Sequence, residues 1–437
     1  MRKFAFIGAG SLQFTTSCLR DLLTFESFKD CEVRLMDINP NHLEYMDKIC
    51  NKIKVAMGCP ECKIITTTDR IEALKGADGV LCTVFNGDVE VWRHEIEIPM
   101  KYGVDINVGD TRSVSGIFRA LRNIPLLLDI CKDIETYCPN AVFLNYTNPM
   151  AMLCNAMQKY SNVEVTGLCH SVQGTIEMLA EWLNIPVDEI DYLCKGVNHQ
   201  AFYTELSHNG EDLYPRLRDF LKDPENFDKE QVRNEMFLKL GYYVTESSGH
   251  NSEYNQWFRK RPDLIEKYCT KKTNWNPGEH AFSLNGRLER KANWQKQYED
   301  FLAKDVDTKK SHEYAADIFN ARLGDGKPFV FNGNVINHGS IPNLPYDCCV
   351  EVPVVADRMG FKTTIAGELP AHLAILVNTT ARIENLVVEA AMKKSKELVY
   401  QAVYMDPLTS AVCSLDEIKN MCDEIFEKNE EFLGDYV

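Results

Sequence analysis

The stretch Lys3-Phe4-Ala5-Phe6-Ile7-Gly8-Ala9-Gly10-Ser11 decides the fold of this chain, because an apolar run there leads directly into a glycine-rich turn. Residues 12–23, which follow, have the spacing of a helix. Glycines between a strand and a helix allow a tight turn and let a pyrophosphate approach the N–H groups at the helix N-terminus. The stretch therefore predicts the first turn of a Rossmann-type domain, with Gly8, Gly10 and Ser11 at the dinucleotide.

An acidic residue at the end of the next apolar run supports this interpretation. Residues 32–36 are the expected second strand, and Asp37 follows them. A carboxylate at this place binds the ribose hydroxyls and repels a 2′-phosphate, so it favours NAD over NADP. The third glycine of the usual G-x-G-x-x-G pattern is replaced by Gln13, and a glycine-rich turn that binds no nucleotide is the alternative.

The rhythm of apolar segments divides the chain into two parts. Up to about residue 170, short apolar runs alternate with helical patterns, which is typical of βαβ units and a parallel sheet. The later residues indicate a mixed sheet. They contain a polar helix-rich stretch (211–325), two strand-like segments (329–336 and 347–355) and long apolar helices from Pro370 onward. The predicted fold is α/β, with an NAD-binding Rossmann-type domain over residues 1–172 and an α+β catalytic and oligomerisation domain over residues 173–437.

The charge balance excludes some partners. Lys and Arg together number 48 and Asp and Glu number 64, which gives a formal net charge of −16. A chain this acidic is a poor candidate for binding nucleic acid or an anionic membrane. No segment approaches the roughly 18 consecutive apolar residues of a membrane helix, and the N-terminus lacks the features of an export signal. We therefore expect a cytoplasmic protein whose cysteines are reduced.

A cysteine and a histidine stand where predicted strands end. Cys169 follows the apolar run 163–168, and His199 follows a second strand-like segment. In open α/β sheets, ligands bind at the carboxyl ends of the strands. A thiolate and an imidazole together bind a divalent metal and leave positions open for substrate oxygens. The alternative is a buried cysteine and an ordinary polar histidine.

Taken together, the motifs resemble the NAD- and metal-dependent glycosidases of glycoside hydrolase family 4. The matching segments, in chain order, are residues 6–11, 93–99, 109–122, 145–149, 169–172, 198–199 and 344–353. The resemblance covers most of the chain. It implies a second domain similar to the C-terminal part of lactate and malate dehydrogenases, and a homo-oligomer.

The residues around the cysteine resemble one branch of that family. Cys169-His170-Ser171-Val172 and the stretch 245–258 are similar to the α-galactosidase (melibiase) branch. Members that act on 6-phosphorylated sugars look different there, with Cys-Asn or Cys-Asp followed by an apolar residue and Pro. The resemblance therefore implies an α-galactosidase that hydrolyses small unphosphorylated α-galactosides such as melibiose.

The family resemblance also implies a redox-assisted elimination. Bound NAD⁺ takes a hydride from carbon 3 of the sugar, and a base then removes the acidified hydrogen at carbon 2. The metal stabilises the enediolate as the aglycone leaves. Water adds at carbon 1 and the hydride returns, so NAD is regenerated in each turnover. This route is an exception to two-carboxylate glycoside hydrolysis.

The resemblance assigns binding roles to five residues. Cys169 and His199 match the metal ligands, with Mn²⁺ as the expected ion. Asn148 matches a substrate-binding amide, and Arg93 matches a substrate-contacting arginine. Arg290 is expected either to close over the sugar or to be a solvated charge on a helix.

The resemblance assigns catalytic roles with more alternatives. Asp110 matches an acid that raises the basicity of the catalytic base. His170 stands where the phospho-sugar branch carries an Asp proton donor, and a histidine there would protonate the leaving oxygen. Tyr254 is the first candidate for the base, with His250 and Glu246 as alternatives. A tyrosine base needs a pKa well below about 10, which a nearby metal would supply.

Three rival functions stay open. The first is another specificity of the family, namely α-glucosidase or α-galacturonidase. The second is a malate-type NAD-dependent dehydrogenase that releases NADH, but such an enzyme needs no metal, so the pair Cys169 and His199 argues against it. The third is a non-catalytic NAD sensor. The amount of NAD⁺ consumed discriminates between a glycosidase of this family and a dehydrogenase. A dehydrogenase consumes NAD⁺ with its substrate, whereas the glycosidase needs only catalytic NAD⁺.

Overall fold

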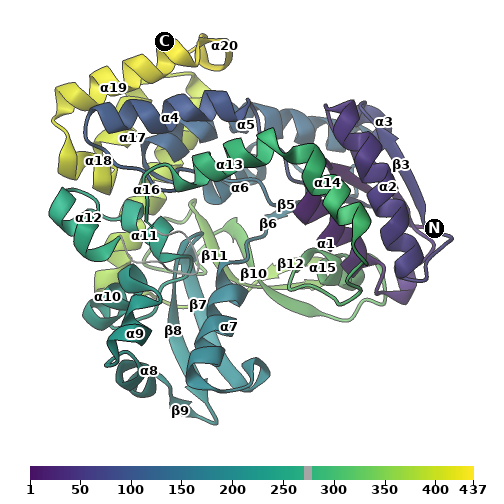
Figure 1. Ribbon diagram of the computed structural model, residues 1–437, viewed down its shortest axis with the longest axis horizontal. Helices are drawn as coiled ribbons and strands as arrows, with labels where there is room; N and C mark the ends of the chain where they lie inside the picture. The colour runs from purple at the N-terminus through teal and green to yellow at the C-terminus, as the bar shows by residue number, and fades with distance from the viewer. Residues whose placement is uncertain (270–277) are drawn as a thin grey trace.

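A single mixed sheet runs through the computed structural model, which describes residues 1–269 and 278–437 (Figure 1). Neighbouring strands follow the order β3-β2-β1-β4-β5-β6-β10-β11-β7-β8-β9, and β12 pairs with β11. The strands are β1 (Lys3–Ile7), β2 (Glu32–Met36), β3 (Lys63–Thr67), β4 (Gly79–Cys82), β5 (Val142–Asn145), β6 (Val165–Gly167), β7 (Ile190–Val197), β8 (Gln200–His208), β9 (Glu211–Asp212), β10 (Phe329–Ile336), β11 (Cys349–Asp357) and β12 (Gly360–Thr363).

The first six strands form a parallel sheet in the order 3-2-1-4-5-6, which is the order of dinucleotide-binding domains. The side chains of β1 alternate between two cores. Phe4 and Phe6 belong to one core, and Ala5 and Ile7 belong to the other. Because both faces are covered, the strand is apolar from Phe4 to Ile7 rather than alternating with polar residues. The prediction of a Rossmann-type parallel sheet is confirmed.

Helices cover both faces of this sheet. One core includes residues of α1, α2 and α15, and the other includes residues of α5, α6, α16 and α17. The helices of the N-terminal half, together with the later helices that pack on it, are α1 (Leu12–Leu22), α2 (Pro40–Ala56), α3 (Arg70–Leu74), α4 (Val89–Lys101), α5 (Ser113–Tyr137), α6 (Met150–Tyr160), α15 (Ala315–Leu323), α16 (Ala371–Lys393), α17 (Lys396–Tyr404), α18 (Pro407–Val412), α19 (Leu415–Lys428) and α20 (Glu430–Leu433).

The second half continues the same sheet with antiparallel strands. β10 pairs with β6 where Asn334 faces Gly167, and it pairs with β11 along its length. The strand predicted at 329–336 is confirmed, whereas the segment predicted at 347–355 is β11, which begins and ends two residues later. Residues 270–277 of the predicted helix-rich stretch lie outside the described residues. The remaining helices are α7 (Ser171–Leu183), α8 (Tyr214–Phe220), α9 (Pro224–Asp228), α10 (Gln231–Leu240), α11 (Ser248–Tyr254), α12 (Pro262–Tyr268), α13 (Phe282–Ala292) and α14 (Trp294–Ala303).

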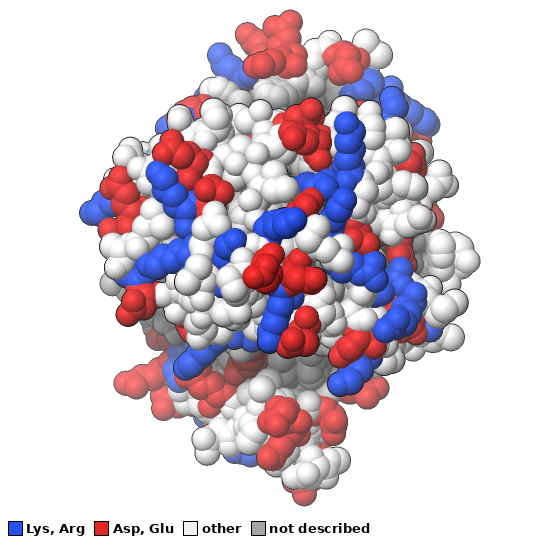
Figure 2. Space-filling view, turned by 90° about the vertical axis from the view of Figure 1, so that its right-hand side faces the viewer, with Lys and Arg blue, Asp and Glu red and all other residues white. Residues whose placement is uncertain are grey.

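The C-terminal helices close the molecule over α5 and α6 (Figure 1). The long apolar helix expected from Pro370 onward is α16, and Pro370 is its N-cap. Within the described part of the chain, no helix combines the length and apolar character that crossing a membrane requires. On the face drawn in Figure 2, acidic and basic side chains are intermixed without a broad basic area.

Candidate active site

The turn after β1 depends on both of its glycines. Gly8 has a φ of +83°, and a Cβ there would lie 2.7 Å from the carbonyl oxygen of Thr83. The N–H of Gly10 donates to Asp37 Oδ2 at 2.8 Å, and a Cβ on Gly10 would lie 2.7 Å from the same oxygen. Ser11 is the N-cap of α1 and makes no side-chain cap hydrogen bond. The turn therefore brings Asp37 and the start of α1 together where Rossmann domains hold a dinucleotide.

A thiol and an imidazole meet beside this edge of the sheet. Cys169 follows β6, and His199 occupies the two-residue turn between β7 and β8 with a φ of +63°. His199 Nε2 lies 3.2 Å from Cys169 Sγ and 3.4 Å from Glu246 Oε2. The potential ligand atoms of these three residues all lie within 4.8 Å of one another. Sulfur, nitrogen and oxygen donors in this arrangement fit a divalent transition metal.

The surroundings of this cluster set its charge. Burial lowers the pKa of His199 to about 4, so its imidazole is neutral at pH 7, which is the form that binds a metal. Burial, together with the carboxylates of Glu351 and Glu246, raises the pKa of the Cys169 thiol well above its usual range. A bound cation would reverse that balance, because coordination favours the thiolate.

The other nitrogen of His199 faces a tyrosine. His199 Nδ1 lies 3.1 Å from the Tyr254 hydroxyl, and Tyr254 is buried. The Arg112 guanidinium lies 4.7 Å from the centre of the Tyr254 ring. Burial raises the pKa of Tyr254 well above its usual value, and the nearby Asp110 adds to this, while Arg112 opposes it. Tyr254 is therefore placed to hold the orientation of His199, besides its predicted role as a base.

A second cluster surrounds Asp110. Asp110 Oδ1 lies 3.6 Å from His250 Nε2, and His250 Nδ1 lies 3.2 Å from Glu246 Oε1. Burial alone would lower the pKa of His250, but the carboxylates of Glu246 and Asp110 raise it to about 9. An imidazole that is protonated at pH 7 has no free nitrogen to accept a proton, which disfavours His250 as the base.

The loop that carries Asp110 is held by a buried carboxylate that the sequence did not single out. Glu253 accepts hydrogen bonds from three consecutive N–H groups, those of Asn107 at 2.7 Å and of Val108 and Gly109 at 2.8 Å. Glu253 and these three residues are about 145 positions apart in the chain, so no local sequence pattern predicts the contact. Glu253 fixes the position from which Asp110 acts.

Asn148 joins the Asp110 cluster through its amide. Its Nδ2 donates to Asp110 Oδ2 at 3.2 Å, and the peptide bond to Pro149 is cis. Asn148 Oδ1 and Arg119 Nη1 are buried, and neither has a hydrogen-bond partner among the described residues. Buried polar atoms are normally satisfied. These two atoms therefore fit a site that a polar ligand completes.

His170 stands apart from the Cys169 and His199 pair. Its side chain is 39% exposed, and its Nε2 is hydrogen bonded to Glu313. Burial would lower the pKa of His170, but the hydrogen bond and the charge of Glu313 raise it above the usual value. Glu313 thus favours the protonated form of this imidazole, which is the form that a proton donor requires.

The two arginines expected at the substrate, Arg93 and Arg290, lie on α4 and α13. Arg93, on α4, is bound by Glu90 at 2.8 Å and Glu97 at 3.4 Å. Arg290 is on the exposed side of α13. Arg287, one turn earlier, has its guanidinium 5.2 Å from the centre of the Phe85 ring and is close enough to Asp110 to interact with its charge. Arg287 is therefore the arginine of α13 that interacts with the charge of Asp110, and the role expected of Arg290 stays a prediction. The buried Leu284 carries a sequence signal for this, because Arg287 follows it at i+3.

Two family models match successive parts of the chain. A model described as "Family 4 glycosyl hydrolase" matches residues 3–185, and one described as "Family 4 glycosyl hydrolase C-terminal domain" matches residues 194–409. An alpha-galactosidase of Bacillus subtilis (strain 168) is 39% identical and covers 100% of both chains. An alpha-galactosidase of Rhizobium meliloti (strain 1021) is 36% identical over 99% of this chain and 89% of the relative.

Solved structures share the fold at lower identity. The 6-phospho-beta glucosidase of Thermotoga maritima, solved with manganese, NAD⁺ and glucose-6-phosphate, aligns with a TM-score of 0.80 at 23% identity and covers 99% of each chain. Lactate dehydrogenase of Eimeria maxima aligns with a TM-score of 0.54 at 17% identity, over 90% of this chain and 94% of the other. The expected relation to lactate and malate dehydrogenase folds is confirmed. With both family models matched and a relative 39% identical over its full length, the chain belongs to the family 4 glycosyl hydrolases.

Proposed function

We propose that this protein is an α-galactosidase that hydrolyses small unphosphorylated α-galactosides such as melibiose, with NAD and Mn²⁺ as cofactors. The observation that carries the proposal is the 3.2 Å approach of Cys169 Sγ to His199 Nε2 beside a Rossmann-type turn. The relatives named above, both alpha-galactosidases, support the choice of sugar. We also infer that residues 1–172 bind NAD, that residues 173–437 form the catalytic domain, and that the protein acts as a cytoplasmic homo-oligomer.

The two cofactors supply what side chains lack. Gly8, Gly10 and Ser11 would hold NAD, which would supply a hydride acceptor, and Cys169 and His199 would hold a divalent ion, which would supply a Lewis acid for the sugar oxygens. Asp37 binds the ribose hydroxyls.

The chain itself binds the sugar and moves protons. Asn148 offers its unpartnered Oδ1 to a sugar hydroxyl, and its amide nitrogen is held by Asp110. Asp110 in turn keeps His250 charged. Tyr254 accepts the proton at carbon 2 as the phenolate that a bound cation beside it would favour, and its oxygen also orients His199. His170, whose pKa is raised by its hydrogen bond to Glu313, donates a proton to the leaving oxygen.

The test is release of nitrophenol from a nitrophenyl α-galactoside under reducing conditions, with and without NAD⁺ and with Mn²⁺ or a chelator. We expect turnover that needs both additives and no net NADH. Turnover of only the α-glucoside or the α-galacturonide would replace the substrate and retain the mechanism. NADH that accumulates from a hydroxy acid, with no glycoside cleaved, would make the protein a dehydrogenase.

A further inference from the structure

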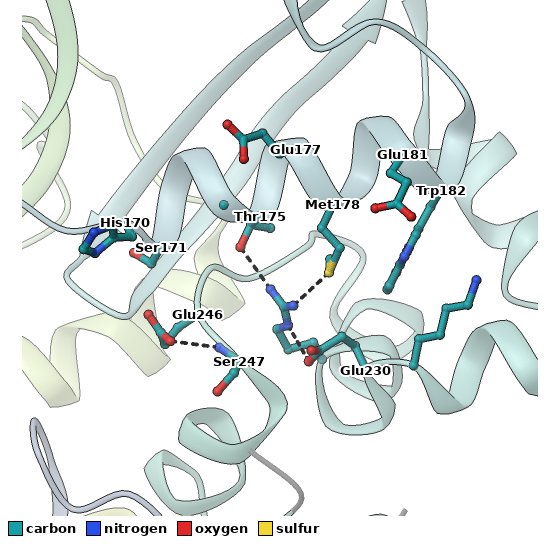
Figure 3. Close-up of a pocket in the computed structure, with 13 residues that line it drawn as sticks. His170, Ser171, Thr175, Glu177, Met178, Glu181, Trp182, Glu230, Glu246 and Ser247 are labelled. Carbon is teal, nitrogen blue, oxygen red and sulfur yellow. Dashed lines mark hydrogen bonds and ion pairs between the residues drawn. The ribbon is translucent and has the colours of Figure 1, made fainter. Parts of the chain in front are cut away.

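A cavity of about 400 Å³ extends away from the metal-ligand cluster along α7. Figure 3 shows His170 and Glu246 at one end of it, Glu181 and Trp182 at the other, and α7 along one side. The opposite wall is formed by the beginning of α10 and by the residues before α11. The cavity is therefore a channel with one end at the reaction centre.

The position of the cavity separates it from the sugar that is oxidised. Glu246, which lines it, lies 3.4 Å from His199 Nε2, and His170, which also lines it, directly follows Cys169 in the chain. Neither Asp110 nor the dinucleotide turn, formed by residues 8–11 and Asp37, is among the described residues that line it. The sugar whose carbon 3 meets NAD must lie on that other side, so the cavity lies beyond the bond that is cleaved.

One face of α7 forms the wall, and a glycine interrupts it. Ser171, Gly174, Thr175 and Met178 line the cavity with the spacing of a single helical face. A Cβ built on Gly174 would meet no heavy atom of the described residues within 4 Å. Glycine inside a helix costs about 1 kcal/mol relative to alanine, and no neighbouring atom requires it here. Its absence of a side chain keeps the channel open.

The lining fits a neutral sugar. Arg233, which is buried, donates to Thr175 Oγ1 at 3.0 Å and is paired with Glu230 at 2.9 Å, so this wall is rigid and polar. Trp182 offers an aromatic ring at the far end and is itself stacked on Phe220, with centroids 5.5 Å apart. Hydroxyls, carboxylates and an aromatic ring are the groups that bind a polyhydroxylated ring. Carboxylates outnumber cations along the wall, which disfavours an anionic occupant.

We infer that this cavity binds the leaving group of the substrate, a neutral sugar or short oligosaccharide, and that Gly174 determines how large that group can be. The inference rests on the proposed function and adds the second half of its substrate. Ser171 and Trp182 are about 16 Å apart along α7, at about 1.5 Å per residue. That length exceeds one sugar ring, so a trisaccharide such as raffinose has room for both units of its leaving group.

The test compares three α-galactosides that share the galactosyl group and differ in the leaving group: methyl α-galactoside, melibiose and raffinose. In Gly174→Leu, we expect kcat/KM for melibiose and raffinose to fall by about tenfold or more relative to kcat/KM for the methyl galactoside. Gly174→Ala is the matched control, because it changes the backbone in the same way but fills much less of the channel. Its ratio should shift far less, and thermal unfolding of both variants reports whether they are folded.

Two further arms keep the inference open to refutation. If Gly174→Leu does not fold, Trp182→Ala replaces it, and raffinose should then lose more kcat/KM than melibiose. Equal losses for all three substrates in the folded variant would overturn the inference. If the wild type cleaves no α-galactoside, the proposed function fails. The kcat/KM values for methyl α-glucoside and an α-glucosyl disaccharide, compared between the wild type and the variant, then test the role of the cavity separately.

Discussion

His199 Nδ1 lies 3.1 Å from the Tyr254 hydroxyl, on the side of the imidazole away from Cys169. A metal on Nε2 requires that Nδ1 carry the proton of the neutral ring, so the Tyr254 oxygen would then accept a hydrogen bond from Nδ1. Partners of this kind fix the tautomer and orientation of a ligand histidine. The same hydroxyl is therefore assigned to ligand positioning as well as to proton abstraction.

Tyr254→Phe should weaken Mn²⁺ binding as well as reduce turnover. Loss of a ligand's hydrogen-bond partner typically lowers metal affinity by about tenfold to a hundredfold. The measurement is the Mn²⁺ dissociation constant by calorimetry on metal-free protein. Tyr243→Phe is a matched control, because that buried hydroxyl bonds to Asn234 instead. Unchanged Mn²⁺ affinity with lost turnover would limit Tyr254 to the role of base.

Cys169→Ser should abolish metal-dependent activity and leave NAD binding largely intact. Serine keeps the size of the side chain but cannot provide a soft thiolate ligand, and Asp37 and the glycine turn do not depend on it. Activity at a range of Mn²⁺ concentrations and calorimetric NAD binding test the two halves of this statement. Cys413→Ser, at the half-buried Cys413, controls for general loss of a thiol. Full activity in Cys169→Ser would remove this residue from the site.

The parallel half of the fold could be predicted because its signals are local. The strands from β1 to β6 are short runs rich in apolar and β-branched residues, and the turn at Gly8 and Gly10 identifies the first of them. The contact between His170 and Glu313 could not be predicted, since the two residues are 143 positions apart and Glu313 lies in a polar stretch with no clear periodicity. The choice between Arg287 and Arg290 depended on helix phase, for which the mostly polar α13 offers few markers.

His250 should make the stability of the metal-free protein depend on pH. Its pKa is about 9 in the folded state against 6.5 for the free side chain. Because the folded pKa is the higher one, the stabilisation is fully present below about pH 6.5 and is lost as the pH rises through about 9. The difference corresponds to up to about 3 kcal/mol.

Chemical denaturation of the wild type and of His250→Gln at pH 6, 7.5 and 9 measures this effect. The free energy of unfolding of the wild type should fall across this interval, and that of His250→Gln should fall less. The carboxylates of Glu246 and Asp110, which face His250 in the wild type, are present in both proteins, so the difference reports on the imidazole. Parallel profiles for the two proteins would mean that His250 is not held in its charged form.

Gly10→Ala should weaken NAD binding without weakening Mn²⁺ binding. A Cβ on Gly10 would lie 2.7 Å from Asp37 Oδ2, so it would push away the carboxylate that binds the Gly10 N–H. Overpacking costs about 1–3 kcal/mol and each 1.4 kcal/mol is tenfold, so NAD affinity should fall by about tenfold or more. Mn²⁺ affinity should be retained, because Cys169 and His199 are untouched. Gly286→Ala is the control, since its Cβ would meet only the Arg290 guanidinium at 3.5 Å. Unaltered NAD affinity in Gly10→Ala would place the dinucleotide elsewhere than at this turn.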